Sequence, residues 1–215
     1  MTPCCSSSHC AAAHYFDETR ASQELAAYHR AGSGKTTRRL LAGLRASGAA
    51  GTLLDVGSGS GVLTLELLKS GVTEATCVDA SAGSLRVARQ EAERQGVAQR
   101  IRWHEGDMVV LGPTLPVADI VTLDRVVCCY HAWRALLEEA AKHSRRWLAF
   151  SYPRDRWYVR VGVQVENLWL RLRGNAFRAF YHPVGAMDAV LRESGLRPIR
   201  HDTTAVWQAS IYGRG

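Results

Sequence analysis

The sequence predicts an α/β fold in which a mostly parallel sheet carries helices on both faces. Two observations predict it. Short apolar runs typical of strands alternate with stretches of helical periodicity, and the first clear run ends in a glycine-rich turn that opens directly into a helix. At 215 residues and 47% hydrophobic composition, the chain is long enough for one domain with a two-sided core.

The glycine-rich turn follows the run Leu53 to Val56. Gly57 and Gly59 permit positive φ and let the backbone approach a ligand closely, while Gly61 permits close packing of the strand against the next helix. That helix runs to Gly71 and directs its free N–H groups toward a bound molecule. The glycine spacing alone also fits dinucleotide binding, or a tight turn with no ligand.

An acidic residue lies at the end of the next predicted strand. The run Ala75 to Val78 ends at Asp79 and Ala80, which lie about 20 residues beyond the glycine turn. A carboxylate at the tip of the neighbouring parallel strand can accept hydrogen bonds from both hydroxyls of a ribose. The alternative is that Asp79 or Ser81 caps the following helix, which the pattern places at Leu85 to Gln95.

Two further strands end in residues suited to a ligand site. The run Ile101 to His104 leads into Asp107 and Met108, and the run Asp119 to Asp124 leads into a polar segment. The carboxyl ends of the strands in an open α/β sheet face the ligand crevice, so substrate chemistry is expected after the second of these runs. The residues there are Asp124, Arg125, Cys128, Cys129, Tyr130 and His131.

His131 and Tyr130 are the candidate catalytic residues. Either could act as a general base on a substrate hydroxyl or carboxyl, and the near-neutral pKa of histidine suits the role best. Two alternatives stay open. His131 could instead cap the next helix, and an acceptor that is already a carboxylate or thiolate would need positioning but no base.

The acid at Asp55, the glycine turn and Asp79 together resemble the class I S-adenosylmethionine-dependent methyltransferases. The resemblance implies a Rossmann-like sheet of seven mostly parallel strands with helices on both faces, an N-terminal helical lid, and S-adenosylmethionine as cofactor. It implies that Asp55 lies near the methionyl part and that Asp107 contacts the adenine amino group while Met108 packs on the ring. The implied cofactor-binding residues are Asp55, Gly57, Ser58, Gly59, Gly61, Asp79, Ala80, Asp107, Met108 and Asp124.

The N-terminal part, residues 1–50, is predicted to be a cysteine-containing segment followed by the helical lid. Helical periodicity extends from Tyr15 to Leu44 with a break at Gly32 to Gly34. The stretch around this break imitates the end of a phosphate-binding loop, but His29 stands where that motif needs glycine. Residues 51–215 are the predicted cofactor-binding domain, with an insertion at about 154–182 for substrate recognition.

The insertion combines apolar residues at helical spacing with arginines. It could cover a large apolar anion or rest on an anionic membrane surface, and packing into the core is the alternative. The predicted substrate-binding residues are Tyr15, Arg125, Arg154 and Trp157. A helix at Val184 to Ser194 and strands at 197–201 and 205–212 complete the fold, and the resemblance implies that the last strand is antiparallel.

The net charge of +7 and the pI of about 9.3 favour an anionic small-molecule substrate. The basic residues show no nucleic-acid-binding signature, so no nucleic acid partner is expected. The N-terminus lacks the form of a secretory signal and no apolar run approaches the length of a membrane span, so a cytoplasmic protein is expected, with peripheral membrane contact as the alternative.

Two substrate classes compete. Element order and the basic insertion resemble the magnesium-protoporphyrin O-methyltransferase branch, which implies an acidic aromatic or porphyrin-like acceptor. A second likeness, to cysteine-dependent arsenite methyltransferases, implies a trivalent metalloid held by Cys4, Cys5, Cys10, Cys128 and Cys129. No metal site is predicted, because these cysteines lack standard zinc spacing. A subunit that binds the cofactor without catalysis is a third interpretation.

Overall fold

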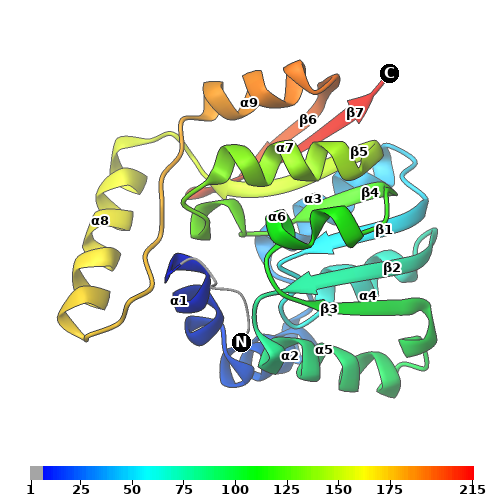
Figure 1. Ribbon diagram of the computed structural model, residues 1–215, viewed down its shortest axis with the longest axis horizontal. Helices are drawn as coiled ribbons and strands as arrows, with labels where there is room; N and C mark the ends of the chain where they lie inside the picture. Colours follow the sequence, from blue (N-terminus) through cyan, green and yellow to red (C-terminus); the bar gives the residue numbers. More distant parts are fainter. Residues whose placement is uncertain (1–6) are drawn as a thin grey trace.

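A seven-stranded sheet forms the centre of the molecule (Figure 1). The computed structural model describes residues 7–215, with side chains from residue 11 onward. The sheet order is β3-β2-β1-β4-β5-β7-β6, in which β1 to β5 are parallel and β7 is antiparallel to both of its neighbours. The strands are β1 Gly51–Val56, β2 Val72–Asp79, β3 Ile101–Glu105, β4 Ala118–Leu123, β5 Ser144–Pro153, β6 Leu196–Thr203 and β7 Trp207–Arg214.

This topology confirms the predicted seven-stranded, mostly parallel sheet and its antiparallel last strand. The helices are α1 Ser7–Tyr15, α2 Glu18–Ala31, α3 Lys35–Ala46, α4 Val62–Leu68, α5 Ala82–Arg94, α6 Met108–Leu111, α7 Trp133–His143, α8 Trp157–Leu172 and α9 Val184–Glu193. Three 3-10 turns, η1 Ala98–Arg100, η2 Gly112–Thr114 and η3 Val127–Cys129, join them.

Two apolar cores cover the two faces of the sheet. On one face the buried strand residues pack against α7 and α9, through side chains such as Leu137 and Leu191. On the other face they pack against α3, α4 and α5, through side chains such as Leu40, Leu65 and Ala92. Because alternate strand residues point to opposite faces, a sheet covered on both sides needs continuous apolar runs, as the sequence of β4 shows.

The start of α5 differs from the predicted boundary because a capping residue sets it. α5 begins at Ala82, three residues earlier than predicted, because the Oγ of Ser81 accepts a hydrogen bond from the backbone N–H of Ser84 at 3.1 Å. The predicted helix break is present, with Gly32 at φ 76° closing α2 and Lys35 starting α3. The segment that resembles a phosphate-binding loop is thus a turn between two helices.

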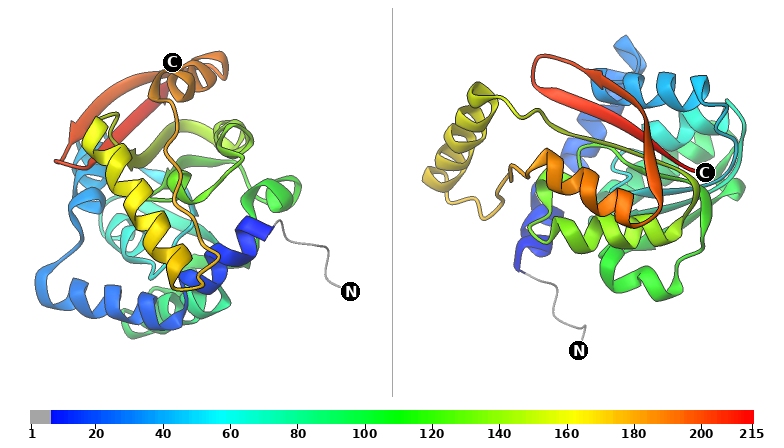
Figure 2. Two further views of the ribbon diagram at one scale, coloured as in Figure 1. Left: turned by 90° about the vertical axis from the view of Figure 1, so that its left-hand side faces the viewer. Right: turned by 90° about the horizontal axis from the view of Figure 1, so that it is seen from above.

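The crossing of the chain at β1 creates the crevice. β1 lies between β2 and β4, so the chain leaves its carboxyl end toward one side and returns on the other. In open α/β sheets ligands bind at this switch point, outside the carboxyl ends of the strands. α1 lies across this end of the sheet, while α3 is part of the core (Figures 1 and 2).

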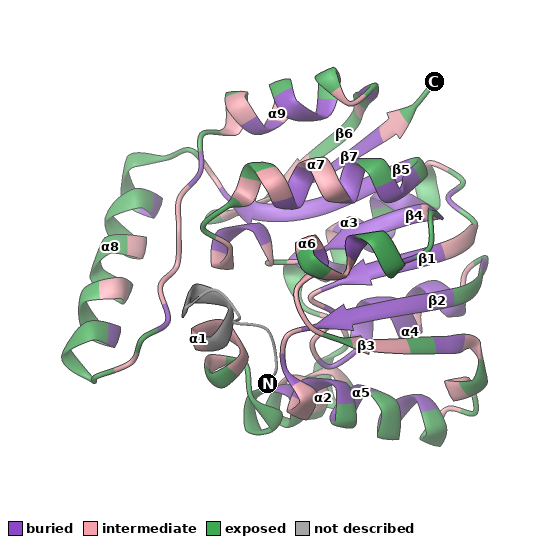
Figure 3. Ribbon diagram, viewed as in Figure 1, coloured by how far each residue is buried: buried purple, intermediate pink, exposed green. Residues whose placement is uncertain are grey.

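α8 stands apart from the sheet on the same side as the carboxyl ends of the strands (Figures 1 and 2). The segment 173–183, called the strap below, leads back from α8 to α9. Most of α8 is exposed (Figure 3). Across residues 7–215, none of the helices has the length and apolar character needed to cross a bilayer.

Candidate functional site

The glycine turn after β1 takes the backbone conformations that the sequence predicts. Gly57, Gly59 and Gly61 have φ of 64°, 52° and 76°. A Cβ at Gly57 would collide with the side chain of Val126, and one at Gly61 would lie 3.0 Å from the Cβ of Ala88 in α5. Gly57 therefore lets the turn approach the segment after β4, and Gly61 lets α4 approach α5.

Asp79 holds this turn in place from the end of β2. Its Oδ2 accepts a hydrogen bond from the backbone N–H of Gly59 at 2.8 Å, and its Oδ1 accepts one from the backbone N–H of Ser81 at 2.9 Å. The carboxylate thus links the glycine turn to the start of α5. Of the two predicted alternatives for capping α5, Ser81 is the residue that does so.

Asp55 is buried at the end of β1, with 2% of its surface exposed. Its carboxylate accepts hydrogen bonds from the hydroxyls of Thr64 at 2.7 Å and Thr122 at 2.6 Å. Burial raises the pKa of Asp55 to about 6. The two hydroxyls act against this shift, and the charges of Asp124 and Asp79 add to it. A buried carboxylate whose ionised form is disfavoured in this way is stabilised by a cation bound nearby.

Asp124 and Arg125 connect the end of β4 to the N-terminal helices. Asp124 accepts hydrogen bonds at 2.6 Å from the hydroxyls of Thr37 in α3 and Ser151 in β5. Arg125 has φ 62°, which is uncommon outside glycine, and its guanidinium forms an ion pair with Glu24 of α2. Glu24 also accepts a hydrogen bond from the Ser60 hydroxyl of the glycine turn at 2.9 Å.

Tyr130 is paired with Asp107 on the other side of the site. Its hydroxyl donates to both carboxylate oxygens of Asp107 at 2.7 Å, and Asp107 also caps α6 by accepting from the backbone N–H of Val109 at 2.8 Å. Burial and the hydrogen bond to Asp107 raise the pKa of Tyr130. The phenol is therefore a proton donor at neutral pH, which does not fit the general-base role predicted for it.

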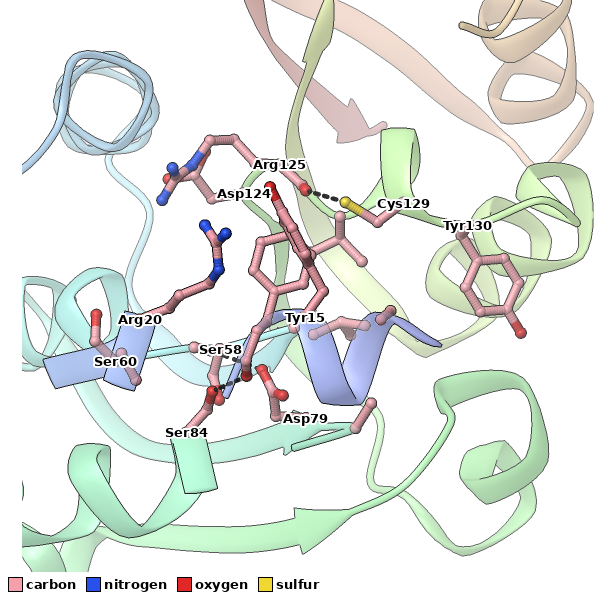
Figure 4. A pocket seen from close by; sticks show the side chains of 18 of the residues that line it. Tyr15, Arg20, Ser58, Ser60, Asp79, Ser84, Asp124, Arg125, Cys129 and Tyr130 are labelled. Carbon is pink, nitrogen blue, oxygen red and sulfur yellow. Dashed lines mark hydrogen bonds between the residues drawn. The ribbon is translucent and has the colours of Figure 1, made fainter. Parts of the chain in front are cut away.

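These side chains surround a cavity of about 610 Å³, a volume within the range of small-molecule sites. The ring of Tyr15 stacks on Phe177 of the strap with centroids 4.3 Å apart, and the guanidinium of Arg20 lies 3.9 Å from the Tyr15 ring centre. Figure 4 shows Arg20 and Arg125 on one side of the cavity, with Tyr130 on the other. The cavity thus has an acidic wall along the strand ends and a basic, aromatic wall formed by the N-terminal helices and the strap.

The cavity gathers most of the predicted residues but not all of them. Gly61 lies behind the turn, where it serves packing. His131 is exposed outside the cavity with its ring against Phe180, and Arg154 donates to the backbone oxygen of Thr204 at 2.9 Å. Trp157 is 76% exposed on α8. The predicted residues that line the cavity are Tyr15, Asp55, Gly57, Ser58, Gly59, Asp79, Ala80, Asp107, Met108, Asp124, Arg125, Cys128, Cys129 and Tyr130.

Of the N-terminal cysteines, Cys4 and Cys5 lie outside the described residues, and so does the side chain of Cys10. Sequence reasoning missed many of the residues that line the cavity, among them Arg20, Glu24, Thr37 and Phe177. Phe177 falls within the insertion predicted for substrate recognition, and this was the one feature of the sequence that could have pointed to it. The other three lie on helices with no local motif, and only the packing of α2 and α3 brings them to the strand ends.

A family model described as a methyltransferase domain matches residues 53–149, which span the strands from β1 into β5. The matched segment contains the glycine turn and the four aspartates of the cavity, Asp55, Asp79, Asp107 and Asp124. The matched residues have the sequence pattern of a methyltransferase domain, and the sheet has the class I methyltransferase fold. The cofactor of this family is S-adenosylmethionine.

The methyltransferase domain is similar to a curated relative, the release factor glutamine methyltransferase of Chlorobaculum tepidum. The two are 30% identical over 125 residues, which are 54% of this chain and 41% of the relative. The chain therefore spans less than half of that relative's length.

Among solved structures, the domain is similar to the magnesium protoporphyrin IX methyltransferase of Synechocystis PCC 6803 with bound S-adenosylhomocysteine. The TM-score is 0.75 at 20% identity, covering 95% of this chain and 98% of that one. An O-methyltransferase family 2 protein from Planctomyces limnophilus, in complex with apigenin, gives a TM-score of 0.62 at 19% identity and covers 84% of this chain and 62% of that one. At these identities the likeness shows the fold.

We expect Asp55→Asn to stabilise the protein without ligand at neutral pH. The folded-state pKa of about 6 lies above the ordinary value of 3.8, so the ionised carboxylate costs stability. The cost is absent below about pH 4, grows as the pH rises to 6, and reaches about 3 kcal/mol above that. Urea unfolding from pH 4 to 7.5 should show the variant gaining on the wild type as the pH rises. A constant difference would contradict the assignment.

Asp119→Asn is the matched control for this series. Hydrogen bonds led by the backbone N–H of Thr52 lower the pKa of Asp119, so ionisation stabilises the fold there. That contribution changes only below about pH 4 and is complete above it, so the control should stay less stable than the wild type by a constant amount from pH 4 to 7.5, in contrast to the growing difference of Asp55→Asn.

We expect Asp79→Ala to weaken binding of S-adenosylmethionine at least tenfold, because it releases the amides of Gly59 and Ser81 as well as removing a carboxylate acceptor. Isothermal titration calorimetry measures the affinity. Asp202→Ala, at an ion pair on β6 far from the cavity, is the control and should bind normally. Unchanged affinity in Asp79→Ala would remove this residue from the cofactor site.

Proposed function

We propose that the protein transfers a methyl group from S-adenosylmethionine to a carboxylate oxygen of an acidic aromatic or porphyrin-like small molecule. The observation that carries the proposal is the pairing of two unlike walls in one cavity. The strand ends supply carboxylates and the glycine turn, and the opposite wall supplies Arg20, Arg125 and the stacked rings of Tyr15 and Phe177.

The acidic wall fits the cofactor. The Oγ of Ser58 is buried without a hydrogen bond to oxygen or nitrogen in the part of the chain described, and it lies in the glycine turn where a ligand would supply a partner. In this proposal Asp79 holds the ribose, while Asp107 and Met108 hold the adenine. Asp55 and Asp124 face the cationic methionyl end. Carboxylate oxygens have lone pairs enough to accept from both protein and ligand.

The basic wall fits an anionic, flat acceptor. Guanidinium groups form paired hydrogen bonds with carboxylates, and the rings of Tyr15 and Phe177 offer an apolar surface beside them. The structural likeness to a magnesium protoporphyrin IX methyltransferase supports an acceptor of this kind. We therefore propose Tyr15, Arg20 and Arg125 as substrate-binding residues.

In this mechanism the chain acts by positioning. Bound S-adenosylmethionine supplies an electrophilic methyl group on a sulfonium. A carboxylate acceptor is already a nucleophile, so holding it in line with that methyl group supplies most of the rate, and no general base is needed. This agrees with His131 lying outside the cavity and with Tyr130 donating to Asp107.

The first test offers labelled S-adenosylmethionine with magnesium protoporphyrin, metal-free protoporphyrin, aromatic acids and neutral phenols, and detects the labelled product by mass spectrometry. We expect a methyl ester of one of the acids. Arg20→Ala should raise KM for that acid about tenfold with a smaller change in kcat, because one charge-assisted contact is lost. Arg86→Gln, at a surface ion pair with Glu18, should leave both constants unchanged.

Failure can take two forms. Cofactor binding without turnover on any acceptor would favour the non-catalytic interpretation. An equal effect of Arg20→Ala on acidic and neutral acceptors would contradict carboxylate recognition.

A second candidate function rests on the adjacent thiols of Cys128 and Cys129. Their Sγ atoms lie 3.7 Å apart, and both residues line the cavity. The neighbouring thiol and burial raise the pKa of Cys129, so it is protonated at neutral pH. Two such thiols can condense with a trivalent arsenic hydroxide and release water, which would place a soft acceptor beside the cofactor. Among residues 11–215, whose side chains the structure describes, no group of three or more His, Cys, Asp and Glu residues is arranged to hold a metal ion.

We expect Cys128→Ser with Cys129→Ser to decide between the two functions. If the acceptor is arsenic, labelled methylarsenical forms in the wild type and is lost in the double variant. If the acceptor is a carboxylic acid, the double variant keeps ester formation within a few fold, since serine conserves the volume of cysteine closely. Cys77→Ser, at a buried cysteine on β2, is the control for nonspecific loss of stability.

A further inference from the structure

α8 presents an apolar stripe to solvent. Five apolar residues recur along it at intervals of four, four, three and four residues, so they lie on one face. All five are exposed, from 47% for Val161 to 78% for Leu172. They are Trp157, Val161, Val165, Leu168 and Leu172. We call this set the α8 stripe.

The orientation of the stripe is fixed by the opposite face of the helix. Val159 and Leu170 on that face are buried, with 4% and 2% of their surfaces exposed. The side chain of Asn167 accepts from the backbone N–H of Ala179 and donates to its carbonyl oxygen, both at 2.8 Å, which ties α8 to the strap. The strap in turn is held to η3, because the backbone N–H of Phe180 donates to the carbonyl oxygen of Cys128. The stripe therefore lies on the solvent-exposed side of α8, a helix that is exposed over most of its length (Figure 3).

Arginines lie along one edge of the stripe and at its ends, and Arg160 among them also forms an ion pair with Asp155. Residues 154–178 contain six arginines and two acidic residues. Arg160 and Arg171 lie along one edge of the stripe, eleven residues apart, and Arg156 and Arg173 lie at its two ends. The guanidinium of Arg173 stacks 4.0 Å from the centre of the Trp169 ring, so a cation and an aromatic ring share the end of the helix.

We propose that α8 docks on the surface of an anionic lipid bilayer, with its stripe in the interfacial layer and its arginines at the phosphates. An exposed apolar stripe edged by arginines and bounded by tryptophan is the pattern of a helix that lies in the plane of a membrane. A second copy of the chain fits less well. Pairing two antiparallel stripes would bring the Arg156 and Arg160 end of one copy against the Arg171 and Arg173 end of the other, and like charges would repel.

Docking by α8 would place the cavity next to the bilayer. Glu166 of α8, together with Phe177 and Ala179 of the strap, lines the cavity, while the stripe points outward from the same helix. An apolar acid dissolved in the bilayer would then meet the cavity opening at the interface. This consequence rests on the proposed function, but membrane docking itself does not.

Vesicle cosedimentation tests the docking. The full chain is mixed with vesicles of phosphatidylcholine alone or with 40% phosphatidylglycerol, a composition of about the anionic density that such helices need. We expect binding to the anionic vesicles, a blue shift of tryptophan emission, and weak binding to phosphatidylcholine alone. Val165→Glu with Leu168→Glu should weaken binding at least tenfold. Val117→Glu introduces one such charge at an exposed valine before β4 and should bind like the wild type.

Arg171→Gln with Arg173→Gln tests the electrostatic part. Each arginine near an anionic surface contributes about fivefold to binding, so the double variant should bind roughly 25-fold more weakly and lose most of its salt dependence. Calorimetric binding of S-adenosylmethionine reports folding of every variant, so loss of docking is distinguished from loss of the cofactor site.

Three outcomes would overturn the proposal. They are no binding of the wild type to anionic vesicles, equal binding by the stripe variant, and light scattering that shows a dimer abolished by the same variant. The last would assign the stripe to a second copy of the chain.

Discussion

The hydrogen bonds from the amides of Gly59 and Ser81 to Asp79 are the interactions on which the shape of the cavity at the glycine turn depends. They fix the turn after β1 relative to the start of α5, and the carboxylate that makes them faces the cavity. The same group thus shapes the turn and remains an acceptor for a ligand. A glycine turn alone has many conformations, and a carboxylate at the tip of the adjacent strand selects one of them.

Several carboxylates gather at the strand ends, and pairs of hydroxyl donors stabilise two of them. Hydroxyls of Thr64 and Thr122 stabilise Asp55, and hydroxyls of Thr37 and Ser151 stabilise Asp124. Neutral donors reduce the cost of burial without cancelling the charge, so the negative potential persists in the cavity. Burial and the neighbouring carboxylates accordingly raise the pKa of Asp55. A site of this kind favours a cationic ligand, as S-adenosylmethionine is.

The opposite wall comes from parts of the chain that are distant in sequence. Tyr15 at the end of α1 stacks on Phe177 of the strap, and Glu24 of α2 joins Arg125 to the glycine turn. One side of the strap therefore completes the cavity, and its other connection is α8 with the exposed stripe. The basic character of this region serves the substrate wall and the proposed membrane contact together, because both would recognise anions beside apolar surface.

The sequence by itself determined the sheet, the glycine turn and the acids at the strand ends, because these depend on local spacing. Asp55 and Asp79 lie at the ends of β1 and β2, while Gly57, Gly59 and Asp107 follow their strands within three residues. In a parallel sheet the ends of neighbouring strands meet. The tertiary structure decided what faces them. The packing of α2 and α3 brings in Arg20, Glu24 and Thr37. His131, Arg154 and Trp157, on other elements, lie outside the cavity. No local pattern encodes those positions, because the direction of a side chain on a lid helix or a strap is set by contacts between segments far apart in the chain.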